Sequence, residues 1–436
     1  MTFLYNAAFF FMALGFLPSF LARTRQAESG RELLRQRLGI LPSSLKETLI
    51  GKRVIWIHAV SVGEVMAVEN FVRRLLRDCP GYHLVLTTVT PTGQKIAKKL
   101  EDSRVSVCYF PFDFSFSVKS FFRDLQPECL LLMETEIWPN LITEASKAHV
   151  PIGILNARLS KRSVKSYKRF RGIFQPLFSR LDFVLAQTDD DALRFSEAGT
   201  PAENVHVLGN MKYDNVPLEA QPEALNKTLR EKWGLDEKMP VWVAGSTHPG
   251  ELMILGRVFL KLREHQPALK LILAPRHVER SREAASKLLD LGLKTVMATE
   301  KKEGVDFDVL ILDQLGVLKE IYALADAVFV GGSMIPKRGG QNPIEPAAFR
   351  KAIVHGPHVF NFERVYQILN EEGGAVLARD ESELAFALER ILGSPAEKER
   401  LGRNAYDAIV SLRGSTERHV RWLSDFLASE TELVKG

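Results

Sequence analysis

Apolar runs of strand length alternate with amphipathic stretches along most of this 436-residue chain. In the first half, the apolar runs predict strands at residues 54–59, 83–88, 105–110, 129–133, 152–155 and 183–186. Between them, helical spacing of apolar residues predicts helices at residues 68–77, 93–100 and 116–125. Continuous apolar strands that alternate with helices are typical of a parallel sheet covered on both faces.

A second alternating set follows a break in this pattern. Residues 208–222 carry no periodicity, contain Pro217 and Pro222, and are predicted to form a linker. Beyond them, strands are predicted at residues 241–245, 271–274, 309–312, 327–330 and 352–355, and the tail is predicted to be helical from Ser382 onward. The predicted fold class is α/β, with two Rossmann-like doubly wound domains, residues 26–214 and 215–436, facing a cleft.

The first residues predict a membrane anchor at residues 1–25. Residues 3–22 carry no charge, and twenty apolar residues are just enough to span a bilayer. Arg23 and Arg25 follow at once, so the positive-inside rule puts both domains on the cytoplasmic side. A cleaved signal peptide needs a positive segment before the apolar run, and none precedes this one. Because Pro18 would kink a helix, an anchor that lies tilted or half-inserted stays open beside a spanning one.

Composition and charge narrow the class of protein. The chain is 46% hydrophobic and 25% charged, so each domain can bury a full core. Its three cysteines form no Cys-x-x-Cys pair, which indicates a reduced compartment and no structural zinc. Residues 1–215 hold 28 basic and 21 acidic side chains, a net charge of +7, whereas the remainder holds 30 and 32, a net charge of −2. A basic first half indicates contact with something anionic.

Glu64 is the first candidate for chemistry. Residues 55–65 combine an apolar run, a turn through Ser61 and Gly63, and the start of a helical pattern. In an open α/β sheet, the turn after a strand's carboxyl end faces the ligand crevice, so Glu64 would point toward a cleft. An ordinary first-turn acid, favoured by the helix dipole, is the structural alternative.

Three further segments of the first half carry acids or cations. Residues 133–140 bring Glu134 and Glu136 to the end of the fourth predicted strand, where either could serve a cleft or cap the next helix. Lys212 lies in the segment that ends the first domain, near the predicted cleft, where it could neutralise a leaving phosphate. The run from Arg158 to Arg171 holds seven basic residues in fourteen and no acid. It predicts a contact with anionic lipid head groups, with a solvated surface as the alternative and nucleic acid as the weaker one.

In the second half, three strand ends suit an anionic ligand. Backbone N–H groups of residues 244–251 could hold a phosphate, or Ser246 or Thr247 could simply cap the next helix. Arg276 follows another strand, where a planar donor fork suits a phosphate or a base carbonyl and a surface salt bridge is the alternative.

The third of these strand ends, residues 330–346, is the most informative. Four glycines flank Lys337 and Arg338, and a helix follows that Pro343 opens, with Glu345 in its first turn. A glycine loop into a helix start suits an anion, and a nearby carboxylate suits the two hydroxyls of a ribose.

Motifs of other enzyme classes are missing from the sequence. It contains no Gly-x-x-x-x-Gly-Lys-Ser/Thr, no His-Glu-x-x-His and no Gly-x-Ser-x-Gly. These gaps weigh against P-loop NTPases, zinc proteases and α/β-hydrolases.

Taken together, the motifs resemble those of the Kdo transferase family (3-deoxy-D-manno-octulosonic acid transferases of lipid A assembly). The resemblance covers nearly the whole chain. The matching segments are His58-Ala-Val-Ser-Val-Gly-Glu64, Thr87-Thr-Val-Thr-Pro-Thr-Gly93, Glu134-Thr-Glu-Ile-Trp-Pro-Asn140, Asn156-Ala-Arg158, Gly209-Asn-Met-Lys212, Gly245-Ser-Thr-His248, Ala274-Pro-Arg-His277 and Asn342-Pro-Ile-Glu-Pro346.

The resemblance implies a GT-B glycosyltransferase at the inner membrane that is inverting and independent of metals or other cofactors. Such an enzyme takes Kdo from CMP-Kdo and attaches it to a lipid A precursor of the lipid IVA type in lipopolysaccharide biosynthesis. By the resemblance, the first domain binds the acceptor and the second binds the nucleotide sugar.

The resemblance also implies roles for individual residues. Glu64 would be the general base, and Glu134 and Lys212 would stabilise the transition state. The implied CMP contacts are Pro275, Arg276, Leu315, Gly316, Val317, Asn342, Pro343, Ile344 and Glu345. The basic residues that would meet the acceptor or membrane are Arg158, Lys161, Arg162, Lys165, Lys168 and Arg169.

Two residues depart from the family pattern. Gln341 stands where the family usually has His, and Val317 where an acid is usual. Two other functions stay open: a GT-B transferase that uses a UDP-sugar, and a non-catalytic membrane-bound scaffold. The number of Kdo residues added, the acyl-chain preference and the oligomeric state are left undetermined by the sequence.

Overall fold

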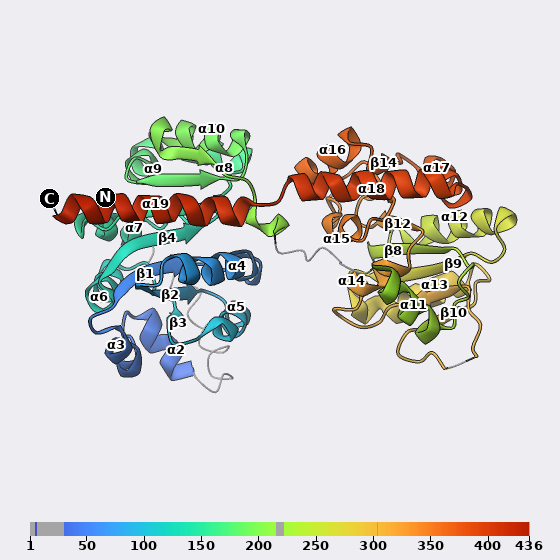
Figure 1. Ribbon diagram of the computed structural model, residues 1–436, viewed down its shortest axis with the longest axis horizontal. Coiled ribbons are helices and arrows are strands. Elements are labelled where there is room, and N and C mark those ends of the chain that lie inside the picture. Colours follow the sequence, from blue (N-terminus) through green and yellow to red (C-terminus); the bar gives the residue numbers. More distant parts are fainter. Residues whose placement is uncertain (1–4, 7–29, 215–221, 303, 436) are drawn as a thin grey trace. The chain divides into compact units, whose positions relative to one another are not determined.

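The computed structural model describes residues 5–6, 30–214, 222–302 and 304–435 (Figure 1). These residues form two compact units, and each contains a parallel seven-stranded sheet with helices on both faces. Unit 1 comprises residues 1–215 together with 413–436, and unit 2 comprises residues 216–412. The two doubly wound α/β folds predicted from the hydrophobic pattern are therefore present.

The sheet of unit 1 has the strand order β3-β2-β1-β4-β5-β6-β7. Its strands are β1 (Arg53–His58), β2 (Tyr82–Thr88), β3 (Val105–Tyr109), β4 (Pro127–Met133), β5 (Ile152–Ala157), β6 (Phe183–Ala186) and β7 (Val205–Val207). Side chains of β1 alternate between two buried layers, with Trp56 in one and Ile57 in the other. Because both faces are covered, β1 and β4 are apolar almost throughout.

Helices of unit 1 cover these two faces. They are α2 (Gly30–Arg37), α3 (Ser43–Leu49), α4 (Val62–Asp78), α5 (Pro91–Ala97), α6 (Ser115–Leu125), α7 (Pro139–Lys147), α8 (Lys161–Arg169), α9 (Arg171–Phe178), α10 (Asp189–Ala198) and α19 (Ser415–Lys435). The buried residues of α4 recur at helical spacing, with Val65, Val68, Val72 and Leu75 on one face.

The last helix of the chain, α19, belongs to unit 1, whereas the sequence boundary puts residues 413–435 in the second domain. Val420 and Leu423 are buried in the same apolar layer as Ile57, and the Trp422 ring lies 4.6 Å from that of Phe183. Figure 1 shows α19 in red along the elements of unit 1. Apolar periodicity predicts that this tail is helical, but it carries no information on which sheet the helix covers.

The sheet of unit 2 has the order β10-β11-β9-β8-β12-β13-β14. Its strands are β8 (Val241–Thr247), β9 (Lys270–Pro275), β10 (Thr295–Met297), β11 (Val309–Ile311), β12 (Ala327–Val330), β13 (Ile353–His355) and β14 (Ala375–Leu377). Its helices are α11 (Pro222–Trp233), α12 (Leu252–His265), α13 (Ser281–Leu289), α14 (Leu318–Ile321), α15 (Ile344–Ala348), α16 (Glu363–Glu371), α17 (Glu381–Gly393) and α18 (Pro395–Ser411). Three short strands, β7, β10 and β14, were not predicted from the sequence.

The predicted anchor, residues 3–22, lies outside the described residues except for Tyr5 and Asn6. Within the part of the chain that the structure describes, no helix is long and apolar enough to cross a bilayer.

Candidate active site

Glu64 lies in the first turn of α4, at the carboxyl end of β1. Its carboxylate accepts hydrogen bonds from the Val60 N–H (2.9 Å) and the Ser61 hydroxyl (2.8 Å), and its own N–H donates to the Ser61 oxygen (3.4 Å). This reciprocal pattern is a variant of the capping box in which the Val60 N–H replaces that of the N-cap Ser61, so the structural role expected of a first-turn acid is present. The hydrogen bonds also fix the carboxylate in one orientation, as a positioned base requires.

Glu134 follows β4, the strand next to β1. The chain leaves β1 toward β2 and β3 on one side and returns to β4 on the other, so the gap between β1 and β4 is the switch point where open α/β sheets bind ligands. Glu134 has a left-handed backbone, with φ of 56°, a conformation that costs energy for a residue other than glycine. Glu64 and Glu134 therefore occupy the same edge of one sheet.

Lys212 reaches this edge from the 3₁₀ turn η3 (Met211–Tyr213). Its Nζ lies 2.5 Å from a Glu134 carboxylate oxygen. Burial raises the pKa of Glu64, the charge of Glu134 raises it further, and the charge of Lys212 lowers it. The three residues singled out in unit 1 thus form one electrostatic group.

Glu136 also belongs to this group, although the predicted site did not include it. The Trp138 indole N–H donates to its carboxylate at 2.8 Å, and burial, followed by the nearby charge of Glu64, raises the pKa of Glu136 to about 7. The sequence signal that could have identified Glu136 is its position two residues after Glu134, at the end of the same predicted strand. Within the described ranges, no group of three or more His, Cys, Asp or Glu side chains could hold a metal ion.

A polar cluster ties the described N-terminal residues to the same sheet edge. Asp113 accepts hydrogen bonds from the N–H groups of Asn140 (3.0 Å) and Leu141 (2.9 Å) at the start of α7, and from the Tyr5 hydroxyl (3.0 Å). The Asn6 amide accepts from the Asn140 amide at 2.7 Å. The beginning of the predicted anchor therefore contacts the helix that follows the Glu134–Glu136 segment.

The basic run forms an exposed surface on α8. Arg158, Lys161, Arg162, Lys165, Lys168 and Arg169 are all exposed, while Val164 is buried and holds the helix on unit 1. Lys168 forms an ion pair with Glu197 at 2.9 Å. Phe170 and Ile173 beside this surface are also exposed, at 53% and 45%. A cationic surface with exposed apolar side chains at its border is the combination that lipid interfaces favour.

In unit 2, the residues expected to contact CMP follow three strands of the sheet, β9, β11 and β12. Pro275 ends β9 and Arg276 follows it, exposed, with its N–H donating to the Thr247 carbonyl at 2.9 Å. The 315–317 segment follows β11, and Leu315 is 79% exposed. Since β11, β9, β8 and β12 are adjacent and parallel, their carboxyl ends share one edge.

The segment after β12 leads into α15 as the glycine-rich pattern predicts. Asn342 accepts a hydrogen bond from the Ile344 N–H at 3.0 Å and approaches the Glu345 carboxylate at 3.4 Å. Pro343 is the residue just before the helix, and burial raises the pKa of Glu345. The unusual Gln341 lies with its amide 3.4 Å from the ring of His248. Asn342 to Glu345 thus stand at the switch point between β8 and β12.

One expectation for unit 2 was wrong. Neither Ser246 nor Thr247 caps α12, whose N-terminus has no side-chain cap. Instead the fully buried Glu251 accepts from the N–H groups of His248 (2.9 Å), Gly332 (2.9 Å) and Met334 (3.1 Å). This carboxylate takes one N–H group of the 244–251 segment and two of the 330–346 segment, and it joins the loops after β8 and β12.

We expect Glu251→Ala to lower the free energy of unfolding by about 2–4 kcal/mol, since it leaves two buried N–H donors and one part-buried donor without this acceptor. Urea unfolding gives this loss, and hydrogen exchange should show faster exchange in residues 331–334. The control is Glu389→Ala, which removes an exposed contact with His265 at 2.8 Å and should cost under about 1 kcal/mol. Equal losses in the two variants would contradict the assigned role of Glu251.

The sequence of the chain is similar to those of known transferases. Residues 32–215 match a family model described as 3-deoxy-D-manno-octulosonic-acid transferase (kdotransferase). The chain is 36% identical over 377 residues to the 3-deoxy-D-manno-octulosonic acid transferase of Haemophilus influenzae, covering 86% of this chain and 87% of that protein. It is 33% identical over 384 residues to the enzyme of the same name from Bordetella pertussis, again covering 86% and 87%.

Solved structures with a similar fold have low sequence identity. A glycosyltransferase from Rickettsia africae matches with a TM-score of 0.59 at 12% identity, covering 86% of this chain and 99% of that one. The UDP-GlcNAc 2-epimerase of Neisseria meningitidis matches with a TM-score of 0.56 at 14% identity, covering 83% and 99%. Both support the two-unit, parallel-sheet architecture of GT-B glycosyltransferases.

Proposed function

The chain belongs to the 3-deoxy-D-manno-octulosonic acid (Kdo) transferase family of lipopolysaccharide biosynthesis, and we propose that it moves Kdo from CMP-Kdo onto a lipid A precursor of the lipid IVA type. The observation that carries this proposal is the convergence of Glu64, Glu134 and Lys212 at the switch point of unit 1. These are the residues that a glycosyl transfer with a general base needs.

In the proposed reaction, Glu64 is the general base. An acceptor hydroxyl oxygen attacks the anomeric carbon of Kdo while Glu64 takes the hydroxyl proton, and the bond from that carbon to the CMP phosphate oxygen breaks. CMP leaves with the bonding electron pair as an anion, and the sugar inverts because the hydroxyl attacks from the face opposite CMP. Burial favours this role, because the raised pKa of Glu64 makes its carboxylate a stronger base than an exposed one.

Lys212 and Glu134 would act on charge. A cation near the reacting centre offsets the negative charge that develops on the phosphate. The ion pair with Glu134 at 2.5 Å would hold the Lys212 ammonium in one position and so reduce the cost of ordering it. The strained backbone of Glu134 supports a site assignment, since such conformations concentrate at functional sites.

Unit 2 would bind the nucleotide part of the donor. Arg276 would supply an exposed guanidinium, and the exposed residues Leu315 and Gly316 with the half-buried Val317 would supply a surface for the base. Glu345 can accept hydrogen bonds from ribose hydroxyls. We further propose that no metal or other cofactor takes part.

The test is an assay of purified protein with CMP-Kdo, a lipid A precursor that carries no Kdo, and EDTA, read by mass spectrometry of the lipid. We expect the lipid mass to rise by whole Kdo units, whose number gives the count per acceptor. No increment with EDTA but an increment after addition of a divalent cation would contradict metal independence. No increment in either condition would contradict the proposed donor or acceptor, and a panel of UDP-sugars would then test the alternative donor.

We propose that α8 contacts the inner membrane from the cytoplasmic side. The double variant Lys161→Glu with Lys165→Glu should then bind vesicles at least about tenfold more weakly, because each basic residue near an anionic surface contributes about 1 kcal/mol to binding. The change in binding is measured by flotation with anionic vesicles that contain about 30% phosphatidylglycerol. The control, Lys98→Glu with Lys99→Glu, reverses two exposed charges elsewhere on unit 1. Equal weakening by both double variants would contradict a role for α8.

A further inference from the structure

The segment that carries Lys212 is held from behind by the sheet of unit 1. Asn156, at the end of β5, is fully buried and left-handed, with φ of 52°, and its side-chain oxygen accepts from the Met211 N–H at 3.0 Å. The Asn210 side chain accepts from the Lys212 N–H at 2.9 Å and donates to Gln187 at 2.9 Å. The backbone around Lys212 is therefore hydrogen-bonded to the ends of β5 and β6.

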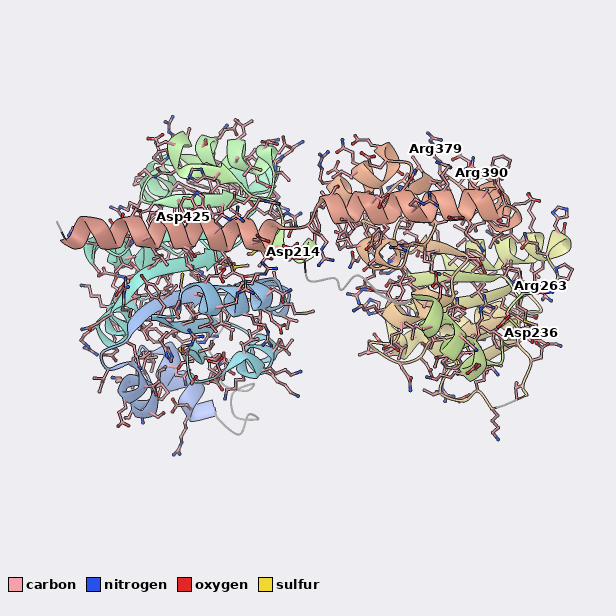
Figure 2. All side chains as sticks on the ribbon, viewed as in Figure 1. Asp214, Asp236, Arg263, Arg379, Arg390 and Asp425 are labelled. Carbon is pink, nitrogen blue, oxygen red and sulfur yellow. The ribbon has the colours of Figure 1, made fainter. Side chains whose placement is uncertain are left out.

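The same segment is held from the other side by the first turn of α19. Asp214 accepts from the N–H groups of Gly414 (2.7 Å) and Thr416 (2.6 Å), and it lies beside the start of α19 in Figure 2. The Arg418 guanidinium donates to the Leu208 carbonyl at 3.0 Å. Both ends of the 208–214 segment thus bond to a helix that is some two hundred residues away in the sequence.

His419 links the two sets of contacts. Its Nε2 accepts from the Asn156 N–H at 3.2 Å, which assigns the ring proton to Nδ1, and Nδ1 donates to the Ser415 carbonyl at 2.8 Å. Burial lowers the pKa of His419 to about 4, so the ring stays neutral at physiological pH. Asn156 therefore connects α19 to Met211, the neighbour of Lys212.

Covalent connectivity gives these contacts a further role. The chain leaves unit 1 for unit 2 just after Asp214, and it returns at Arg413. Asp214 bonds to Gly414 and Thr416, so it joins the outgoing and returning chains two residues from Lys212.

We propose that Asp214 and the first turn of α19 position Lys212, so that the C-terminal helix contributes to the geometry of the site in unit 1. This proposal rests on the proposed function, in which Lys212 acts on the transition state. Asp214 would be a positioning residue that acts through Lys212. A displacement of about 1 Å in such a group is enough to lower turnover by up to about a hundredfold.

The experiment compares Asp214→Ala, Lys212→Met and the double variant in steady-state assays with CMP-Kdo and the lipid acceptor. We expect Asp214→Ala to lower kcat by about tenfold or more with KM for CMP-Kdo nearly unchanged. In the Lys212→Met background, the same substitution should change kcat by less than about twofold, because residues that act through one another are not additive. Full additivity of the two losses would overturn the proposal.

The pH profile supplies a readout that a purely structural loss would not move. If Asp214 holds the Lys212 ammonium near Glu64, then loss of the Asp214 carboxylate lets this ammonium move away. The positive charge that lowers the pKa of Glu64 is then lost from the site. The acid limb of kcat/KM should then move to higher pH in Asp214→Ala, in the same direction as in Lys212→Met. An unmoved limb in Asp214→Ala, with a moved limb in Lys212→Met, would overturn the positioning role.

A matched control removes a similar helix cap in unit 2. Asp380 accepts from the N–H groups of Ser382 and Glu383, both at 2.9 Å, at the start of α17. We expect Asp380→Ala to leave kcat and the pH limb unchanged. If Asp214→Ala does not fold, Asp214→Asn and Arg418→Met provide milder losses of the same contacts. Wild-type turnover in Lys212→Met would instead refute the role of Lys212 in the proposed function, which separates the two failures.

Discussion

Glu64→Gln is expected to lower turnover by about 10²–10⁴-fold, the range that general base catalysis contributes. The substitution removes the group that takes the acceptor proton but keeps nearly the same shape. Glutamine also serves in a capping box, so the hydrogen bonds with Val60 and Ser61 can persist and the fold should keep its stability. Binding of CMP, which we assign to unit 2, should be unchanged.

Three measurements test this expectation: turnover by mass spectrometry of the lipid, CMP affinity by calorimetry, and thermal unfolding. Glu69→Gln is the matched control, because Glu69 lies on the same helix and its side chain is 41% exposed. Among the ion pairs of the described residues, Glu69 pairs only with Arg73, at 3.1 Å. The control should keep full turnover. Wild-type turnover in Glu64→Gln would show that another group takes the proton, and Glu136 would be the next candidate.

Much of this site was predictable because it lies at strand ends. Long apolar runs predicted the strands that carry the sites, and the turn after a parallel strand must lie at the carboxyl edge of its sheet. This argument predicts that Glu64 and Glu134 lie at the carboxyl edge of the sheet. The structure adds that their strands, β1 and β4, are neighbours. The roles of the individual residues came from the family motifs, since neither periodicity nor spacing distinguishes a base from a helix cap.

The strands that escaped prediction are short and peripheral. Each of β7, β10 and β14 has only three residues, and each is an edge strand of its sheet. Val205–Val207 is interrupted by His206, and Thr295–Met297 and Ala375–Leu377 are too short to show a period. Their conformation is imposed by pairing with the neighbouring strand rather than by their own sequence.

Long-range polar contacts were hidden for a different reason. Glu251 looks like an ordinary acid near a helix start, but its partners Gly332 and Met334 lie more than eighty residues away. Asp214 contacts Thr416 across two hundred and two residues. A single sequence without homologues contains no signal for such pairs, so the assignment of α19 to unit 1 had to come from the structure.

Lys212→Met is expected to lower kcat by about 10²-fold, comparable with the loss of one preorganised group that stabilises transition-state charge. The substitution removes the ion-pair partner of Glu134 and leaves the Glu134 carboxylate beside Glu64. Lys212→Arg keeps the positive charge and should restore part of the activity.

The pH dependence of these variants follows from the sign of each charge on Glu64. Lys212 lowers the pKa of Glu64, so Lys212→Met should raise it and move the acid limb of kcat/KM to higher pH, because the base must be deprotonated to act. Glu134 raises that pKa, so Glu134→Gln should move the limb to lower pH. Lys119→Met, which removes an exposed cation from α6, should leave the limb in place. Shifts of the same sign in Lys212→Met and Glu134→Gln would contradict the electrostatic coupling, because opposite charges beside one carboxylate must move its pKa in opposite directions.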